Sequence, residues 1–283
     1  MRIIVAGGNG FIGKSLTSYL RNSGHEVTCL LRKDFEINQL KEKLEGCDVV
    51  INAVGKSIAG IWTRRRKKEI YSSRVETTGK LVKAILDCEK VIPVYINFSA
   101  VGIYDNVALH SEGSMSYANN YLAKLIIDWE GACKDLDEEG CRTILLRMGV
   151  VLDKNGGILG RLKGLLRVRF CIGITGNDGL AYIHLLDLLR IIVFIINNDS
   201  LHGVVNAVAP EIVSIRDFYR QLCTAGRAKI CLWFSPWLIK LFLGEGAVIL
   251  TTGQRVVPAR LQQKGFEFRF PDLNMVLNNL LHQ

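Results

Sequence analysis

A glycine-rich turn between an apolar strand and an amphipathic helix is the feature that most constrains how this chain folds. The apolar run at residues 2–6 is followed by Gly7, Gly10 and Gly13 in a G-x-x-G-x-x-G pattern, and apolar residues then repeat at helical spacing over 12–20. Backbone N–H groups at a helix N-terminus bind phosphate, and glycines let a phosphate approach the backbone closely. We therefore predict a dinucleotide site, with an ordinary glycine-rich turn as the alternative.

The first hundred residues alternate strand-like runs with helix-like segments, which is typical of βαβ units and a parallel sheet. The chain has 283 residues, of which 49% are apolar, so it is globular and large enough for a domain with a small lobe. We predict a Rossmann-type, doubly wound parallel sheet in 1–150, with later returns to the sheet, and a small C-terminal α/β substrate lobe in 151–283. Strands are expected at 2–6, 26–31, 48–51, 94–98, 141–147 and 204–206, and helices at 65–88, 117–139, 185–197 and 214–225.

The end of the second predicted strand indicates which dinucleotide the turn would bind. An NAD site has an acidic residue there for the ribose 2′-hydroxyl, whereas this strand ends in Leu31, Arg32 and Lys33. Arginine presents a rigid fork to phosphate, so Arg32 is the candidate for the 2′-phosphate of NADP, with Lys33 as a second charge. Asp34 lies outside the strand beside two cations, and we do not assign it to the ribose. A solvated strand end is the alternative.

Together with the glycine turn, several segments make the chain resemble the extended short-chain dehydrogenase/reductases. Within them, it is most similar to the NADP-dependent nucleotide-sugar epimerase family that has a C-terminal domain of unknown function. The resemblance covers essentially the whole chain, and it implies a Rossmann domain followed by a lobe whose family-specific part is at about 235–283. The segments that carry the resemblance are 51–55, 73–78, 97–102, 145–152, 182–188, 205–210 and 253–258.

The resemblance also implies a cofactor, a set of binding residues and a class of reaction. The cofactor would be NADP(H), and the reaction an oxidoreduction or epimerisation of an unidentified small-molecule substrate, with a homodimer as a candidate assembly. With Leu31, Arg32 and Lys33 from the end of the second strand included, the expected cofactor-binding residues are Gly7, Gly10, Phe11, Ile12, Gly13, Leu31, Arg32, Lys33, Ala53, Val54, Gly55, Glu69, Arg74 and Val150.

The catalytic pair of the superfamily is missing from this chain. That chemistry needs a tyrosine made acidic by a lysine four residues later, on the same helix face, and none of the eight tyrosines has one. Tyr121 has Lys124 at the third position, which turns the ammonium group by roughly 100° around the helix, so a helix-surface pair is favoured over a catalytic one. Ser99 matches the superfamily's serine, and Tyr104 is either an alternative acid or a tyrosine that fills a gap.

Two functions therefore stay open. The first is an NADP(H)-dependent oxidoreductase or epimerase, which the retained Ser99 favours. The second is an NADP(H)-binding protein with little or no catalysis, acting as a redox sensor or a structural partner, which the absent tyrosine and lysine pair favours.

The net charge of +9 suits anionic ligands but does not select among them. Five cations at 64–68 would point all round a helix, and no aromatic residue alternates with them, so a helix start near the cofactor is favoured over a nucleic-acid site. The apolar stretch at 230–250 is interrupted by proline, glycine and charged residues, so we expect no membrane span.

The remaining polar residues indicate a protein without a metal site. No His, Cys and carboxylate cluster has metal-ligand spacing, and the eight cysteines include no CxxC pair, which favours a reducing compartment such as the cytoplasm. His184 and Asp187 are expected to fix the helix that follows them. The apolar residues Trp233, Phe234, Trp237, Leu238, Leu241 and Phe242 predict a helix facing the core or a partner.

Overall fold

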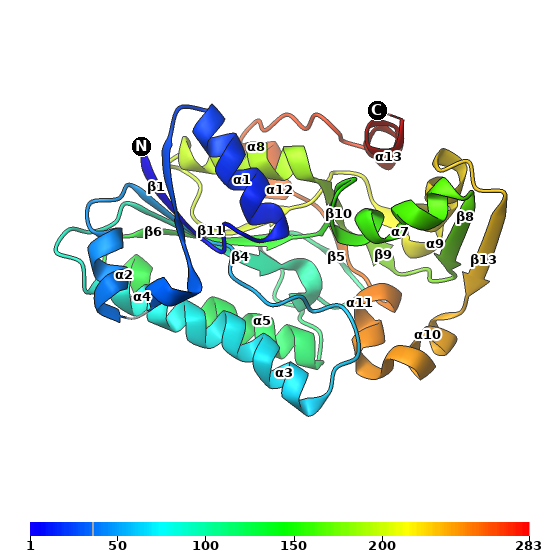
Figure 1. Ribbon diagram of the computed structural model, residues 1–283, viewed down its shortest axis with the longest axis horizontal. Coiled ribbons are helices and arrows are strands. Elements are labelled where there is room, and N and C mark those ends of the chain that lie inside the picture. Colours follow the sequence, from blue (N-terminus) through cyan, green and yellow to red (C-terminus); the bar gives the residue numbers. More distant parts are fainter. Residues whose placement is uncertain (36, 283) are drawn as a thin grey trace.

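The centre of the molecule is a parallel sheet of six strands, in the order β11-β6-β4-β3-β1-β2 (Figure 1). The computed structural model describes residues 1–35 and 37–282, without the side chains of 32 and 37–39. The chain moves outward from β1 to β2 and then returns past β1 to β3. The strands are β1 (Arg2–Ala6), β2 (Glu26–Leu30), β3 (Val49–Asn52), β4 (Val94–Ala100), β6 (Arg142–Met148) and β11 (Gly203–Ala207).

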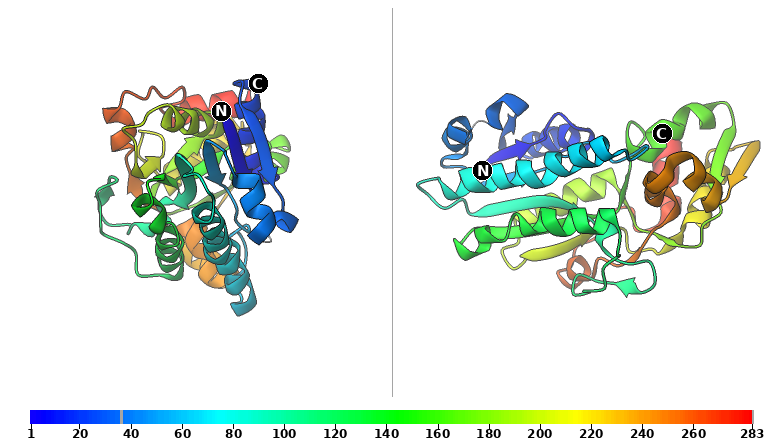
Figure 2. Two further views of the ribbon diagram at one scale, coloured as in Figure 1. Left: turned by 90° about the vertical axis from the view of Figure 1, so that its left-hand side faces the viewer. Right: turned by 90° about the horizontal axis from the view of Figure 1, so that it is seen from below.

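Helices cover both faces of this sheet, which explains why its strands are nearly continuous apolar runs. The helices α1 and α8 pack on one face, and α2, α4 and α5 pack on the other, as Figures 1 and 2 show from three directions. The doubly wound Rossmann-type sheet predicted from the sequence is confirmed. The helices are α1 (Phe11–Asn22), α2 (Ile37–Leu44), α4 (Thr77–Leu86), α5 (Tyr121–Gly131), α6 (Asp135–Glu138) and α8 (Leu185–Ile196).

The helix predicted at 65–88 is one long helical segment with a local widening in the middle. It consists of α3 (Arg64–Tyr71), a π-helical turn η2 (Ser72–Glu76) and α4. Thr63 caps its start, because the side-chain oxygen accepts a hydrogen bond from the backbone N–H of Arg66. A π-turn inside a helix changes which side chains face a neighbouring surface, and such turns are frequent at functional sites.

Beside the sheet, segments of the chain after β6 other than α8 and β11 form a lobe with its own apolar core. Its centre is a parallel pair of strands, β8 (Phe170–Ile174) and β13 (Ile230–Phe234), packed on helices of the same lobe. The lobe's helices and the remaining short elements are α7 (Gly157–Arg167), α9 (Ile215–Ala225), α10 (Pro236–Leu243), α11 (Val248–Thr251), α12 (Ala259–Gln263), α13 (Leu273–Leu281), β5 (Leu109–His110), β7 (Val150–Leu152), β9 (Gly179–Leu180), β10 (Tyr182–His184), β12 (Val213–Ser214) and β14 (Arg255–Val256).

His184 and Asp187 have the structural role that the sequence favoured. His184 caps α8, since its Nδ1 accepts a hydrogen bond from the backbone N–H of Leu186. The carboxylate of Asp187 is fully buried and accepts the backbone N–H groups of Arg269 and Phe270. The pair thereby joins α8 to the C-terminal segment of the chain.

Two helix predictions need correction. The helix expected at 117–139 begins only at Tyr121, because the Asn120 side chain caps it, and it ends at Gly131 before the short α6. The apolar residues from 233 to 242 are divided between β13 and α10, which begins after the Ser235 cap with Pro236 in its first turn. Neither element is a buried core helix, because the side chains of Trp233, Trp237, Leu241 and Phe242 are exposed.

Candidate functional site

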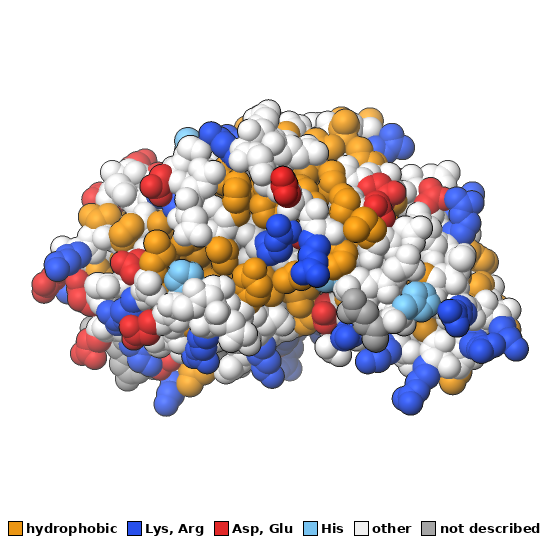
Figure 3. All heavy atoms as spheres, turned by 90° about the horizontal axis from the view of Figure 1, so that it is seen from above, with side chains coloured by type: hydrophobic (Ala, Val, Ile, Leu, Met, Phe, Trp, Pro, Cys, Tyr) orange, Lys and Arg blue, Asp and Glu red, His pale blue; other side chains and the backbone are white. Residues whose placement is uncertain are grey.

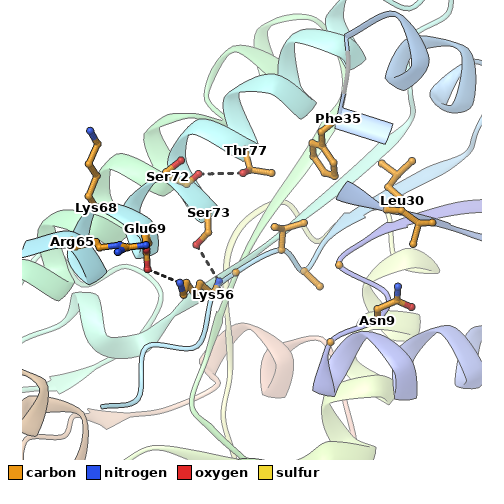
Figure 4. Close-up of a pocket in the computed structure, with 16 residues that line it drawn as sticks. Asn9, Leu30, Phe35, Lys56, Arg65, Lys68, Glu69, Ser72, Ser73 and Thr77 are labelled. Atoms are coloured by element: carbon orange, nitrogen blue, oxygen red, sulfur yellow. Dashed lines mark hydrogen bonds and ion pairs between the residues drawn. The ribbon is translucent and has the colours of Figure 1, made fainter. Parts of the chain in front are cut away.

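A cavity of about 1050 Å³ lies over the C-terminal ends of β1, β2 and β3, where the strand order reverses. Ligands of open α/β sheets bind at such a reversal, because the loops after the two strands diverge there. The glycine turn, the loop after β3 and the helix α3 with η2 form its walls (Figure 4). The lining residues are Gly7, Asn9, Gly10, Leu30, Leu31, Phe35, Ala53, Val54, Gly55, Lys56, Arg65, Lys68, Glu69, Ser72, Ser73 and Thr77.

The glycines of the turn are required by its geometry. Gly7 has φ +83°, and a Cβ atom there would lie 2.6 Å from the carbonyl oxygen of Ala53. A Cβ on Gly13 would lie 2.2 Å from the carbonyl oxygen of Gly7. The first turn of α1 can therefore pack this closely on the glycine turn only if residue 13 has no side chain. Gly10 precedes α1, which has neither a side-chain cap nor an acidic residue in its first turn. This helix N-terminus therefore keeps its N–H groups and positive dipole end for an anion.

The end of β2 offers the cavity no carboxylate among the described residues. Asp34, the acidic residue next in sequence, is 2% exposed and forms an ion pair with Lys43 at 2.6 Å. Its carboxylate also accepts the backbone N–H of Leu31, and the hydrogen bond from Lys43 is the main reason that its pKa lies below the usual value. Lys33 is exposed beside it. The side chain of Arg32 lies outside the described part, so its role stays a prediction.

The opposite wall of the cavity is polar and carries four charged residues, Lys56, Arg65, Lys68 and Glu69. Glu69 accepts Lys56 Nζ at 2.5 Å and Arg65 Nε at 3.0 Å, and these two hydrogen bonds, that of Lys56 first, lower the pKa of the carboxyl group. The backbone N–H of Lys56 donates to Ser73 Oγ at 3.0 Å (Figure 4). The turn η2 thus brings serine hydroxyls and the loop after β3 to one rim.

Several predicted cofactor residues lie beside the cavity rather than in its wall. Arg74 is mostly buried and donates from Nη1 to the carbonyl of Lys56 at 2.9 Å, and burial lowers its pKa to about 10. A Cβ on Gly55 would meet this guanidinium at 2.9 Å, so Arg74 supports the loop after β3 from behind. The Phe11 ring packs against Gly156, where a Cβ would lie 2.1 Å from it. Ile12, Gly13, Lys33 and Val150 are likewise outside the lining of the described cavity.

The hydroxyl group of Ser99 is used in a contact within the protein. The side chain is 1% exposed and donates a hydrogen bond to Glu130 Oε1 at 2.5 Å. Glu130 forms a buried ion pair with Arg147 at 2.6 Å. Because successive residues of a strand point to opposite faces, position 99 of β4 faces α5, which carries Glu130. The Ser99 hydroxyl is therefore part of a buried polar network.

The two candidate tyrosines also use their hydroxyl groups in contacts within the protein. Tyr104 is fully buried, accepts Arg147 Nη1 at 2.9 Å and donates to Asn206 Oδ1 at 3.1 Å. Tyr121 donates to the carbonyl of Lys67 at 2.8 Å, whereas Lys124 is exposed and its ammonium group has no hydrogen bond or ion pair with a described residue. Burial raises the pKa of both tyrosines, which is opposite to what proton transfer near neutral pH needs.

The basic residues of the run at 64–68 contact different parts of the protein. Arg65 pairs with Glu69 at the cavity, and Lys68 lines the same cavity. Arg66 Nη2 donates to the carbonyls at positions 57 and 59, and Lys67 forms an ion pair with Glu245. These contacts agree with a helix start near the cofactor site, and the absence of nucleic-acid binding stays a prediction.

Sequence reasoning missed nine residues that line the cavity. The signal for Arg65 and Lys68 was present, since the sequence places the basic run at a helix start near the cofactor. The widening of the helix at η2, which brings several of them to the cavity, has no clear sequence signal. The missed residues are Asn9, Leu30, Phe35, Lys56, Arg65, Lys68, Ser72, Ser73 and Thr77.

The described residues contain neither a metal-binding cluster nor a helix that could span a membrane. Within 1–35 and 37–282, no three or more His, Cys, Asp or Glu side chains come together as a set that could hold a metal ion. In the same part of the chain, every helix is too short or too polar to cross a membrane.

Comparison with known proteins relates this geometry to a family. The sequence pattern of the NAD dependent epimerase/dehydratase family matches residues 3–207, and a domain of unknown function (DUF1731) matches 236–280. The chain is 32% identical over 295 residues to the epimerase family protein SDR39U1 of Homo sapiens, with 99% of this chain and 100% of the relative covered. It is 29% identical to the epimerase family protein YfhF of Bacillus subtilis, with 99% and 98% covered.

The fold comparison agrees with the sequence comparison. The crystal structure of human epimerase family protein SDR39U1 (isoform 2) with NADPH superposes with a TM-score of 0.91 at 30% identity. The superposition covers 100% of this chain and 99% of that one.

Proposed function

The chain belongs to the NAD dependent epimerase/dehydratase family, and on that premise we propose that it binds NADP(H) in the cavity over β1, β2 and β3. The observation that carries the proposal is the glycine turn, whose uncapped helix N-terminus opens onto that cavity beside a strand end without a free carboxylate among the described residues. The relative that was crystallised with NADPH supports the same cofactor.

The residues around the cavity fit the parts of a phosphorylated dinucleotide. Backbone N–H groups between Gly7 and Gly13 would hold the pyrophosphate, because an anion is stabilised at the N-terminal end of α1. Arg32 would hold the 2′-phosphate, with Lys33 as a second charge, since Asp34 is already paired with Lys43. Bound NADPH would supply a hydride to a substrate, and the residues around the cavity would hold the cofactor in position.

The contacts of the candidate catalytic hydroxyl groups favour a cofactor-binding protein with little or no catalysis. No tyrosine among these candidates is placed to act as an acid. The hydroxyl groups of Ser99, Tyr104 and Tyr121 are each used in a contact within the protein. Membership of the family favours the other function, that of an oxidoreductase or epimerase acting on an unidentified small molecule. A homodimer, a cytoplasmic location and a substrate lobe from residue 151 onward are further parts of the proposal.

We expect Arg32→Ala to weaken NADPH binding by about 2 kcal/mol, the scale of one hydrogen bond between charged groups. Binding of NADH should be nearly unchanged, because NADH has no 2′-phosphate. A fluorescence titration with both nucleotides measures the two affinities, and Lys90→Ala, a change of an exposed cation in another turn, serves as the control. An equal loss for NADPH and NADH would contradict the assignment of Arg32.

We expect Tyr121→Phe to leave NADPH affinity and any measurable NADPH-linked turnover within a few-fold of the parent protein. The lost hydrogen bond joins Tyr121 to a backbone carbonyl, and Lys124 is exposed rather than paired with the phenol. Loss of a positioned acid–base group would instead lower the rate by about 10²–10⁴-fold.

Ser99→Ala is the companion variant and separates stability from chemistry. It removes a hydrogen bond to the buried Glu130, so urea unfolding should report a loss of about 1–3 kcal/mol while NADPH affinity is retained. A loss of turnover in Ser99→Ala without a change in stability would instead indicate that Ser99 contacts the substrate or cofactor.

A further inference from the structure

One corner of the C-terminal lobe exposes a group of large apolar side chains. Ile230 and Leu232 lie exposed on β13, and only Ser235 separates this strand from α10. On α10, Trp237 and Phe242 are 71% and 70% exposed. With Leu241 of the same helix, these residues form what we call the β13–α10 surface. An apolar group of this size at the surface of a protein usually marks an interaction site.

The strand pairing explains why one face of β13 is left open. Cys231 stands beside Cys171 of β8, and Cys171 belongs to the core between these strands and α9. Alternation along the strands therefore turns Ile230 and Leu232 to the opposite face, with Phe170 and Ile172 as their neighbours on β8. The outer face of the pair is thus apolar across both strands.

Among charged side chains, the segments that form and flank the β13–α10 surface carry only basic ones, and Glu245, the acidic residue that follows α10, is paired with Lys67. Residues 157–175 and 226–243 contain seven Lys and Arg and neither Asp nor Glu, so they carry +7 of the chain's +9. All seven side chains are exposed and none forms an ion pair with a described residue. Figure 3 shows basic side chains at the right-hand end of the molecule, which carries α7, β8 and β13 in Figure 1. The seven residues are Arg161, Lys163, Arg167, Arg169, Arg227, Lys229 and Lys240.

Two of these cations occupy backbone positions where arginine is unfavourable. Arg169 has φ 59° and Arg227 has φ 50°, in the left-handed region that glycine adopts without steric cost. They lie in the turns before β8 and β13, and the backbone N–H of Lys229 donates to the carbonyl of Arg169 at 2.7 Å. The parallel strands thus begin at one basic end, where two arginines have a left-handed backbone conformation.

An occupant of this surface must accept both bulky apolar side chains and many cations. A second copy of the chain would bring two surfaces of charge +7 together, which repel each other. The headgroup region of an anionic bilayer meets both needs, because its phosphates attract Lys and Arg while Trp, Phe and Leu enter the boundary with the acyl chains. We propose that the β13–α10 surface binds peripherally to anionic lipid membranes.

Vesicle flotation tests this proposal with the full chain. The parent protein should float with vesicles of phosphatidylcholine mixed with phosphatidylglycerol and stay behind with phosphatidylcholine alone. Arg169→Gly combined with Arg227→Gly removes two cations while suiting the backbone, so it should weaken binding by about tenfold or more, given the contribution of each cation near a charged bilayer. Trp237→Ser combined with Phe242→Ser should weaken it further.

A matched control is Val107→Ser combined with Met115→Ser, which changes two exposed apolar residues of a different loop and should leave vesicle binding unchanged. Thermal unfolding followed by circular dichroism checks that every variant is folded. The proposal would be overturned by failure of the parent to bind the anionic vesicles, by equal binding to both vesicle types, or by an equal loss in the control. A dimer in light scattering that Trp237→Ser with Phe242→Ser dissociates would also overturn it, since a second copy would then cover the surface.

Discussion

Replacing Gly13 by alanine should abolish measurable NADPH binding at nucleotide concentrations that saturate the parent protein. The new Cβ atom would lie 2.2 Å from the carbonyl oxygen of Gly7 and 2.8 Å from the Cα atom of Gly8. The backbone must shift to relieve these contacts, which costs roughly 1–3 kcal/mol in a packed region. The shift also misplaces the N–H groups offered to the pyrophosphate, and hydrogen bonds to charged groups contribute about 1.5–3 kcal/mol each. Titration of the variant with NADPH measures the loss.

Gly79→Ala is the matched control for this substitution. Gly79 lies in α4, and a Cβ atom there would meet nothing within 4 Å. Alanine is favoured over glycine inside a helix, so the control should bind NADPH as the parent does and unfold at a similar or higher urea concentration. If the Gly13→Ala variant bound NADPH with the affinity of the parent protein, the proposal that the glycine turn binds the nucleotide would be wrong.

Glu130→Leu should lower the free energy of unfolding by about 3–5 kcal/mol, which is the usual effect of removing one partner of a buried ion pair. Arg147 is almost fully buried, and its guanidinium depends on both carboxylate oxygens of Glu130. The same change leaves Ser99 without its hydrogen-bond acceptor. Urea unfolding of the purified protein measures this effect.

A double variant distinguishes the buried charge from a packing defect. Glu130→Leu combined with Arg147→Met removes both charges, so it should recover much of the stability lost in the single variant. Arg220→Ala, which breaks the exposed pair with Asp217, should cost less than about 1 kcal/mol. A loss below that limit in Glu130→Leu would mean that the network around Ser99 and Tyr104 contributes little to stability.

The sheet could be predicted from the sequence because its strands are short apolar runs with buried side chains on both faces. In β3, all four residues from Val49 to Asn52 are buried, and the run ends where the cavity begins. Apolar spacing does not indicate where α5 starts, because that start depends on one side-chain cap by Asn120. Sequence periodicity alone also merged β13 and α10, although Ser235 and Pro236 together form a helix-start signal.

The candidate site was predictable where one sequence motif determines the geometry. The glycine turn is of this kind, because Gly7 and Gly10 line the cavity. The wall formed by Lys56, Arg65 and Glu69 depends on a π-turn and on ion pairs between distant residues, which have no local pattern. The placement of Ser99 depends on strand alternation, which a match to a superfamily serine does not include.

Isothermal titration of the parent protein with NADPH and then with NADH tests the proposed function most directly. We expect one NADPH site per chain and an affinity for NADH weaker by about tenfold or more, because each hydrogen bond to the charged 2′-phosphate contributes about 1.5–3 kcal/mol. Failure to bind NADPH, or equal affinities for the two nucleotides, would contradict the proposed NADP(H) site.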